Sequence, residues 1–306
     1  MFRRVFLCLA VGGCATAAGS GHHDSPDARE QPGTPDARET PGTPDAPEQP
    51  GTPDAAPTPT PDAPPQITQS SLLLSEVQLA PTGGEFIEIV NPTASAVSLD
   101  HYYVSDVGTY WKLPAGTQTV DSGDFIVQFK AGSSIPAKGV ITIATDTAAN
   151  FKTTNGVSPT YSIADGTVTV VASNSTPTLT NAGEMVVLFT WDGASDLVTD
   201  VDLMIAGAAS STNTITPKSG MSVDGPDADS IASTYKTDLD SIAVQGATPA
   251  SAKSTKRLML ETGHEMQQGS GNGSDGDDET SEATGTTWDT TFSAPTPGTV
   301  PSTLTP

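Results

Sequence analysis

Residues Leu72–Asp106 read LLLSEVQLAPTGGEFIEIVNPTASAVSLDHYYVSD and contain the densest strand-like pattern in the chain. From Glu76 to Leu79, polar and apolar side chains alternate with the period of two that a half-buried β-strand shows. The proline and two glycines of Pro81–Gly84 predict a turn. A second strand is predicted at Phe86–Val90, and it ends before Pro92 because proline cannot donate a hydrogen bond to a neighbouring strand.

Two shorter strands are predicted in the remainder of this stretch, from Val97 to Leu99 and from Tyr102 to Val104. Glu85 and Glu88 are the charged residues of the second strand region, and we expect both carboxylates to be available to face water. Four strands in so short a stretch, separated by turn residues, indicate an all-β fold.

The same residues resemble the lamin tail domain family. The likeness is carried by Ser75–Val77, Glu85–Ile89 with Asn91-Pro92, Val97, Leu99 and Val104–Asp106. Near the C-terminus, Arg257 and Pro295-Thr296-Pro297-Gly298 are similar to the basic residue and the Pro-x-Pro-Gly end of the family. The resemblance implies an immunoglobulin-like β-sandwich with long insertions, which we place at residues 70–298 and expect to be followed by a frayed tail, 299–306.

Further strands are predicted along the chain by alternating or continuous apolar runs. They are Tyr110–Leu113, Phe125–Phe129, Val140–Ile143, Val168–Val171, Val186–Phe189, Leu197–Ile205 and Arg257–Leu260. Two short helices are also predicted. One runs from Asp146, as its N-cap, to Asn155. The other follows Asp229, because Ile231, Tyr235, Leu239 and Ile242 fall on one helical face.

The charge balance excludes one large class of partner. The chain has 36 Asp and Glu residues but only 13 Lys and Arg, for a net charge of −23. Binding to nucleic acid phosphates requires clustered basic side chains, so no nucleic acid partner is expected. Aromatic residues make up 5% of the chain. The predicted core therefore depends on Val, Ile, Leu and Ala.

The N-terminus has the features of a lipoprotein signal peptide, residues 1–13. Arg3 and Arg4 precede an apolar run that is too short to span a bilayer. Val11-Gly12-Gly13-Cys14 is similar to a bacterial lipobox, in which the cysteine thiol receives the lipid. Ala15 in the following position indicates outer-membrane retention. An ordinary signal peptide, with Cys14 incidental, is the alternative. The only other cysteine, Cys8, lies within the leader, so no disulfide is predicted in the domain.

A proline-rich repeat separates this leader from the predicted domain. From Pro26 the sequence reads PDAREQPGT, PDARETPGT and PDAPEQPGT, followed by two shortened copies. These units have too little apolar surface to form a core, so residues 14–66 are predicted to be a disordered stalk. The prolines of Ser25–Pro65 favour an extended chain that would hold the domain up to roughly 100 Å from its anchor.

The sequence contains no complete catalytic motif. His264-Glu265 begins like the zinc-binding HExxH motif, but Gln268 stands where the second histidine would be, and one imidazole cannot make that site. There is no GxSxG motif for a hydrolase nucleophile. We therefore predict that the protein is not an enzyme.

Calcium is the best candidate ligand, because hard carboxylate oxygens on a glycine-rich loop suit this ion. Residues 272–279 form such a loop, with the candidate ligands Asp275, Asp277, Asp278 and Glu279. A second acidic cluster comprises Asp224, Asp227 and Asp229. The alternative is that both are solvated acidic loops.

These features together predict an outer-membrane lipoprotein, anchored through Cys14, that displays a β-sandwich for binding or adhesion in the bacterial cell envelope. An envelope protein or a polysaccharide is the expected partner. The alternative is an accessory or divergent envelope hydrolase, either dependent on calcium or independent of it. The sequence does not identify the residues of a binding face.

Overall fold

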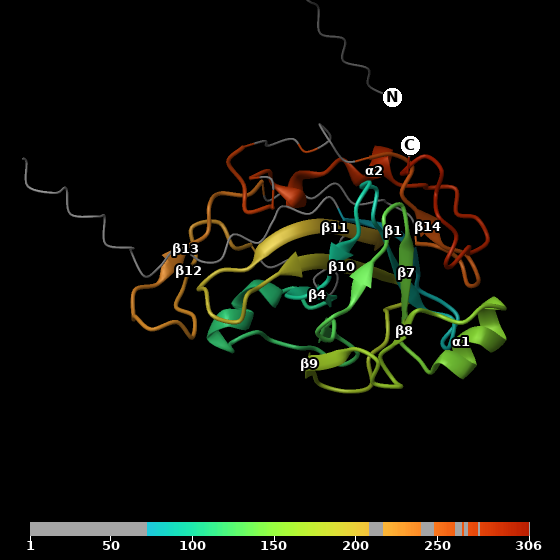
Figure 1. Cartoon of the computed structure of the whole chain (residues 1–306), viewed down its shortest axis with the longest axis horizontal. Helices are drawn as coiled ribbons and strands as arrows, with labels where there is room; N and C mark the ends of the chain where they lie inside the picture. The colour runs from blue at the N-terminus through green and yellow to red at the C-terminus, as the bar shows by residue number, and fades with distance from the viewer. Residues whose placement is uncertain are drawn as a thin grey trace, which may run out of the picture. The chain divides into compact units, whose positions relative to one another are not determined.

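The structure is a computed structural model that describes residues 72–207, 217–239, 248–260, 265, 269–274 and 276–305 (Figure 1). The predicted leader with Cys14, the stalk at 14–66, and Asp275 lie outside the described residues. Within the described part of the chain, no helix is both long enough and apolar enough to cross a membrane.

Two five-stranded sheets form the body of the domain. The first has the order β14-β1-β2-β7-β8, with β14 at Thr255–Lys256, β1 at Leu73–Gln78, β2 at Phe86–Val90, β7 at Val140–Ala144 and β8 at Tyr161–Ser162. The second has the order β11-β10-β4-β5-β9, with β11 at Thr199–Gly207, β10 at Gly183–Thr190, β4 at Tyr102–Ser105, β5 at Phe125–Gln128 and β9 at Thr169–Ser173. Every pairing is antiparallel except that of β7 with β8.

The two sheets pack face to face, as the family resemblance implies. One cluster of buried apolar residues includes Leu74 and Ile87 from the first sheet and Val104 and Leu188 from the second. Such residues alternate along their strands, so each strand directs one side into the shared core. The prediction of an immunoglobulin-like β-sandwich is confirmed.

Shorter elements connect and cover the sheets. They are β3 at Val97–Ser98, β6 at Ser134–Ile135, β12 at Ser222–Val223, β13 at Ser233–Thr234, the α-helices α1 at Ala148–Asn155 and α2 at Thr284–Thr287, and the 3-10 helices η1 at Tyr110–Ala115 and η2 at Glu279–Ser281. The small sheets pair β3 with β6 and β12 with β13.

The segment after β4 was predicted to be a strand, and that prediction is wrong. Tyr110–Ala115 forms the 3-10 helix η1, which ends at Gly116 with a left-handed backbone, φ 65°. Tyr110 packs against Phe189 with a ring-centroid distance of 5.2 Å, and Phe189 stacks on Tyr103 at 5.1 Å. The aromatic residues of η1 thus help to cover the second sheet with a second apolar cluster.

The two predicted helices have different outcomes. α1 ends before Gly156 as expected, but its N-cap is Thr147, whose hydroxyl accepts the N–H of Asn150, rather than Asp146. In the described residues up to Leu239 the helix predicted after Asp229 does not form, and Ile242 lies outside the described residues. Ser233–Thr234 is instead the strand β13, and Ile231 is 75% exposed. Tertiary pairing with β12 overrides the helical spacing of the apolar residues.

Glu85 and Glu88 do not face water, contrary to the prediction. They are 2% and 0% exposed, because different segments far away in sequence cover each of them. Leu179 donates its N–H to Glu85 at 3.1 Å, and Gly298 donates its N–H to Glu88 at 2.7 Å. Burial is the main cause that raises the pKa of Glu88 to about 8.

Two predictions near the C-terminus also change. The last strand of the first sheet is Thr255–Lys256 rather than Arg257–Leu260, and Leu258 is 46% exposed. In the tail after Gly298, Leu304 is buried in one apolar cluster with residues of β1 and β2. At Leu304, therefore, the tail is packed rather than frayed.

Candidate functional site

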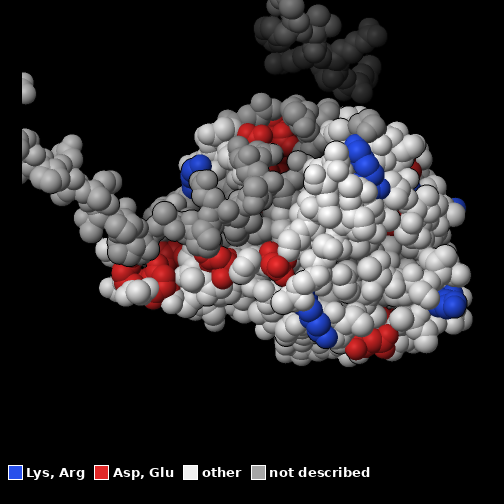
Figure 2. All heavy atoms as spheres, viewed as in Figure 1, with Lys and Arg blue, Asp and Glu red and all other residues white. Residues whose placement is uncertain are grey.

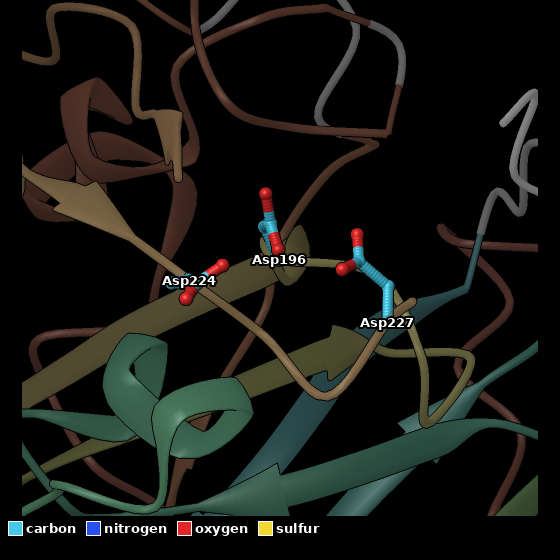
Figure 3. Close-up of side chains that lie close together, drawn as sticks. All are labelled: Asp196, Asp224 and Asp227. Carbon is cyan, nitrogen blue, oxygen red and sulfur yellow. The ribbon is translucent and has the colours of Figure 1, made fainter. Parts of the chain in front are cut away.

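Three carboxylates gather at the surface beside the hairpin of β12 and β13 (Figure 3). They belong to Asp196, in the loop between β10 and β11, and to Asp224 and Asp227, in the loop between β12 and β13. One oxygen from each lies within 4.8 Å of the other two. Asp196 is buried, whereas Asp224 and Asp227 are exposed.

Asp196 holds this arrangement together. One of its oxygens accepts the N–H of Gly225 at 2.7 Å, and the other accepts the N–H of Ser233 at 2.9 Å. Its partial burial works to raise the pKa of Asp196, but these hydrogen bonds outweigh that effect and lower it. Asp196 is thus ionised and fixes the loop that carries Asp224 and Asp227.

The pKa of Asp227 is raised. Its loss of hydration is the first cause, and the negative charges of Asp229, Asp196 and Asp224 add to it. A hard divalent cation such as Ca²⁺ would relieve this repulsion, with backbone carbonyls or water completing its six to eight oxygen ligands. The geometry therefore suits a cation at the surface.

The sequence anticipated only part of this cluster. Asp224 and Asp227 were named as candidates, and the structure brings them together. Asp229 was named as well, but its Oδ1 accepts the N–H of Ile231 at 2.7 Å in a local turn. Asp196 was missed, since it lies in another loop far away in sequence and no local pattern marks it.

The other predicted calcium loop is used differently. Asp277 accepts the N–H of Gly269 at 2.6 Å. Asp278 is 1% exposed and caps η2, where it accepts the N–H of Thr280 and, from across the fold, the N–H of Leu239. Glu279 is 5% exposed. Among the described residues, none of these three belongs to a group of metal-ligating side chains like that around Asp196.

Lys218 anchors one buried ionic network under the second sheet. Its ammonium lies 2.7 Å from Asp200 and 2.7 Å from Asp238, and all three residues are nearly inaccessible to solvent. Tyr110 donates its hydroxyl to Asp200 at 2.7 Å. Burial alone would lower the pKa of Lys218, but the two carboxylates raise it, so the amine stays protonated.

Arg257 anchors the second network. Its guanidinium donates to Asp202 at 2.6 Å and to Glu282 at 2.7 Å, and its Nε donates to the carbonyl of Leu74 at 2.9 Å. It also lies over the ring of Trp288, 5.0 Å from the centroid. This one side chain connects β1, β11 and the C-terminal segment. Arg257, the basic residue that resembles the one in the family pattern, therefore has a structural role.

A third group of buried carboxylates lies at the end of β4. Asp106 is 1% exposed, and its Oδ1 accepts the N–H of Phe125 at 2.6 Å. Its Oδ2 has no hydrogen-bond partner among the described residues. Burial, and then the nearby charge of Glu184, raise its pKa. Burial likewise raises the pKa of Glu184 to about 8.

The described residues show no arrangement for nucleophilic catalysis. Their one histidine, His101, is exposed. Among the described residues, no hydroxyl group is hydrogen-bonded to its imidazole ring. His264 and Gln268, from the incomplete zinc motif, lie outside the described residues. The buried bases Lys218 and Arg257 and the carboxylates they contact hold segments of the fold together.

Comparison with known proteins agrees with this architecture. The Lamin Tail Domain family model matches residues 65–268, about two thirds of the chain. No curated protein matches it. The chain is similar to the crystal structure of a DUF4876 family protein from Bacteroides thetaiotaomicron VPI-5482, with 16% identity over 77% of this chain and 74% of that one. The TM-score is 0.37, which carries no argument about fold or function.

The family match and the sandwich lead to one assignment. The match includes Leu72–Asp106 and Arg257 and ends before Pro295–Gly298, so the likeness of that closing motif stays a prediction. The chain belongs to the lamin tail domain family, a non-catalytic family with an immunoglobulin-like fold.

Proposed function

We propose that this protein is a lipid-anchored component of the bacterial cell envelope that displays its lamin tail domain as a binding or adhesion module. In this proposal Cys14 carries the lipid, residues 14–66 are the spacer, and the sandwich faces outward from the outer membrane. The order of these parts along the chain supports the proposal. An anchor and a long spacer are useful only if the domain must reach something at a distance from the membrane.

The binding role is supported by a difference between two sets of ionisable groups in the domain, those that are buried and paired and those that are exposed. Lys218 and Arg257 each hold buried carboxylates together, so these groups serve the fold. Asp224 and Asp227 are exposed on a loop that a buried residue fixes. On the face shown in Figure 2, acidic side chains gather at the end where β12 and β13 lie in Figure 1, while basic side chains are scattered. This surface suits a cationic or cation-bridged partner.

The anchor is tested by labelling cells that express the chain with an alkyne fatty acid. We expect the wild-type chain to incorporate the label and to fractionate with the outer membrane, and Cys14→Ser to lose both properties. Cys8→Ser is the matched control, because Cys8 lies inside the predicted leader. Equal labelling of wild type and Cys14→Ser would contradict the anchor and leave the binding role to be tested separately.

The binding role is tested with the unlipidated Cys14→Ser chain and isolated envelope fractions. We expect the chain to sediment with the envelope, and Asp224→Asn with Asp227→Asn to weaken the association. Pretreating the fractions with protease or with polysaccharide hydrolases distinguishes a protein partner from a polysaccharide. Turnover of envelope polymers by the purified chain, abolished by a chelator, would favour the alternative of a calcium-dependent hydrolase.

A further inference from the structure

The four outer edges of the two sheets are not equivalent. Beyond β14, residues on either side of the strand bridge to Ser293 and Trp288, and β11 bridges to Gly273. β8 has only two residues, and Thr167 donates its N–H to the carbonyl of Ser162 there. The fourth edge is β9, which has five residues.

β9 is open along its outer side. Its residues are exposed apart from Ala172, and Val170 and Val171 are 41% and 40% exposed. Within the described part of the chain, the backbone of β9 pairs with β5 and with nothing on the other side. An open edge with exposed β-branched residues is a template for another strand. In Figure 1, β9 lies at the lower margin of the molecule.

The charge pattern around this edge limits what can bind there. From Gly166 to Gly183 the chain has no charged residue, although the whole chain has a net charge of −23. Proteins commonly protect exposed edges with lysine, proline or a β-bulge. β9 has no lysine or proline, and it has a bulge at Val171. The stalk is a poor occupant, because its many prolines cannot donate hydrogen bonds to a strand. The fitting occupant is a neutral strand.

We propose that β9 pairs antiparallel with β9 of a second copy of this chain, about a two-fold axis, to join two five-stranded sheets into one of ten strands. A second copy supplies the same charge-free strand, and an antiparallel pair of identical strands is self-complementary. In the dimer, the outer side of β9 is paired in both copies, so neither copy keeps an open edge there. Since β14 and β11 are covered, the assembly closes as a dimer instead of growing into a fibre.

The geometry also sets the strength of this dimer. Ala172 faces Ile126 and Val170 faces Val127, so Val171 is the extra residue of a β-bulge. The bulge shortens the strand available for pairing. The interface is therefore smaller than the roughly 800 Å² per partner of a stable complex. The dimer is weak, depends on protein concentration, and is strengthened by salt, which screens the repulsion between two acidic bodies.

Sedimentation of the full chain with Cys14→Ser, from micromolar to millimolar concentration, tests this proposal. We expect a monomer–dimer equilibrium that shifts toward the dimer as salt increases. Val170→Lys weakens dimerisation by about tenfold or more, because it places like charges near the two-fold axis. Val157→Lys is the matched control, since Val157 is 44% exposed but lies outside the sheets. Circular dichroism verifies that both variants remain folded.

Hydrogen exchange on the wild-type chain locates the interface without any substitution. We expect the amide protection of residues 169–173 to rise with concentration and that of α1 to stay constant. A chain that remains monomeric throughout overturns the proposal. So does a folded Val170→Lys variant that dimerises like wild type, or a dimer whose formation leaves β9 unprotected. Dimerisation weakened by salt would also overturn it, since this would indicate an electrostatic contact.

Discussion

The second sheet contains two kinds of buried carboxylate, and the difference lies in whether a cation accompanies them. Asp200 and Asp202 of β11 each meet a buried base, Lys218 or Arg257. Asp106 and Glu184, at the end of β4 and the start of β10, have no such base, and the charge of Glu184 acts on Asp106. Taking a charge out of water costs several kcal/mol unless a partner compensates for it. Buried bases thus accompany Asp200 and Asp202, although burial still raises the pKa of Asp202 to about 7. Burial also raises the pKa of Asp106 and of Glu184, which favours their protonated forms.

Removing Arg257 is the strongest test of this comparison. We expect Arg257→Met, which keeps much of the side-chain volume, to reduce the free energy of unfolding by about 3–5 kcal/mol. The reason is that Asp202 and Glu282 lose the buried guanidinium that donates hydrogen bonds to both of them. Denaturant unfolding at neutral pH measures the loss. Lys256→Met is the neighbouring control, since Lys256 lies at the surface 3.8 Å from Glu76, and we expect a loss of about 0–1 kcal/mol. Equal losses for the two variants would contradict the structural role of Arg257.

Removing Lys218 has a smaller expected effect. Lys218→Met costs about 3 kcal/mol, at the lower end for a broken buried pair. Tyr110 still donates to Asp200, and the side-chain amide of Asn272 still donates to Asp238. Denaturant unfolding at neutral pH measures this loss. A loss no larger than that of Lys256→Met would contradict the role of the buried ion pairs of Lys218.

Asp106 and Glu184, the buried carboxylates that lack a base, are tested at Glu184 through the dependence of the free energy of unfolding on pH. Its pKa is 4.5 in model compounds and about 8 in the fold, chiefly through burial. Between these values the folded chain keeps a proton that the unfolded chain has lost. The free energy of unfolding therefore falls as pH rises through this window, by up to about 1.4 kcal/mol per pH unit for one such group.

The matched variants for this slope are Glu184→Gln and Asp100→Asn. We expect Glu184→Gln to flatten the slope in part, since Glu88, with its pKa also at about 8, contributes to the same window. Asp100 is exposed, and the N–H of Gly132 lowers its pKa, so Asp100→Asn leaves the slope unchanged. Chemical unfolding at a series of pH values measures both. An unchanged slope in Glu184→Gln would show that Glu184 does not hold the proton.

The sequence predicted the elements whose signal is local. Leu72–Asp106 forms β1 to β4 close to the predicted positions, because alternation and turn residues are properties of neighbouring residues. The burial of Glu88 could not be predicted in this way, since it depends on Gly298, more than two hundred residues later. The helix expected after Asp229 fails for a similar reason. Its spacing is helical, but the segment pairs with β12 and hydrogen-bonds to Asp196.

The candidate site shows the same limit. Asp224 and Asp227 were predicted from their proximity in sequence, which the short hairpin loop preserves in space. Asp196 completes the cluster from another loop, so only the fold could identify it. Conversely, the acidic run at 272–279 looked like the better ion site. Its described members Asp277 and Asp278 are occupied by backbone N–H groups that close the loop.

A third kind of carboxylate occurs in the surface cluster of Asp196, Asp224 and Asp227, where Asp224 and Asp227 are exposed to solvent. Asp227→Asn removes one charge from the three, so we expect a slightly higher melting temperature than wild type in a chelator. Millimolar calcium then raises the melting temperature of wild type more than that of the variant, since ligand binding stabilises the state that binds. Asp229→Asn is the control, because its amide oxygen still accepts the N–H of Ile231 and Asp229 is outside the trio. Asp277→Asn tests the other predicted loop in the same titration. If calcium shifts none of these chains, Asp224 and Asp227 are solvated charges, and Asp196 serves only to hold the hairpin.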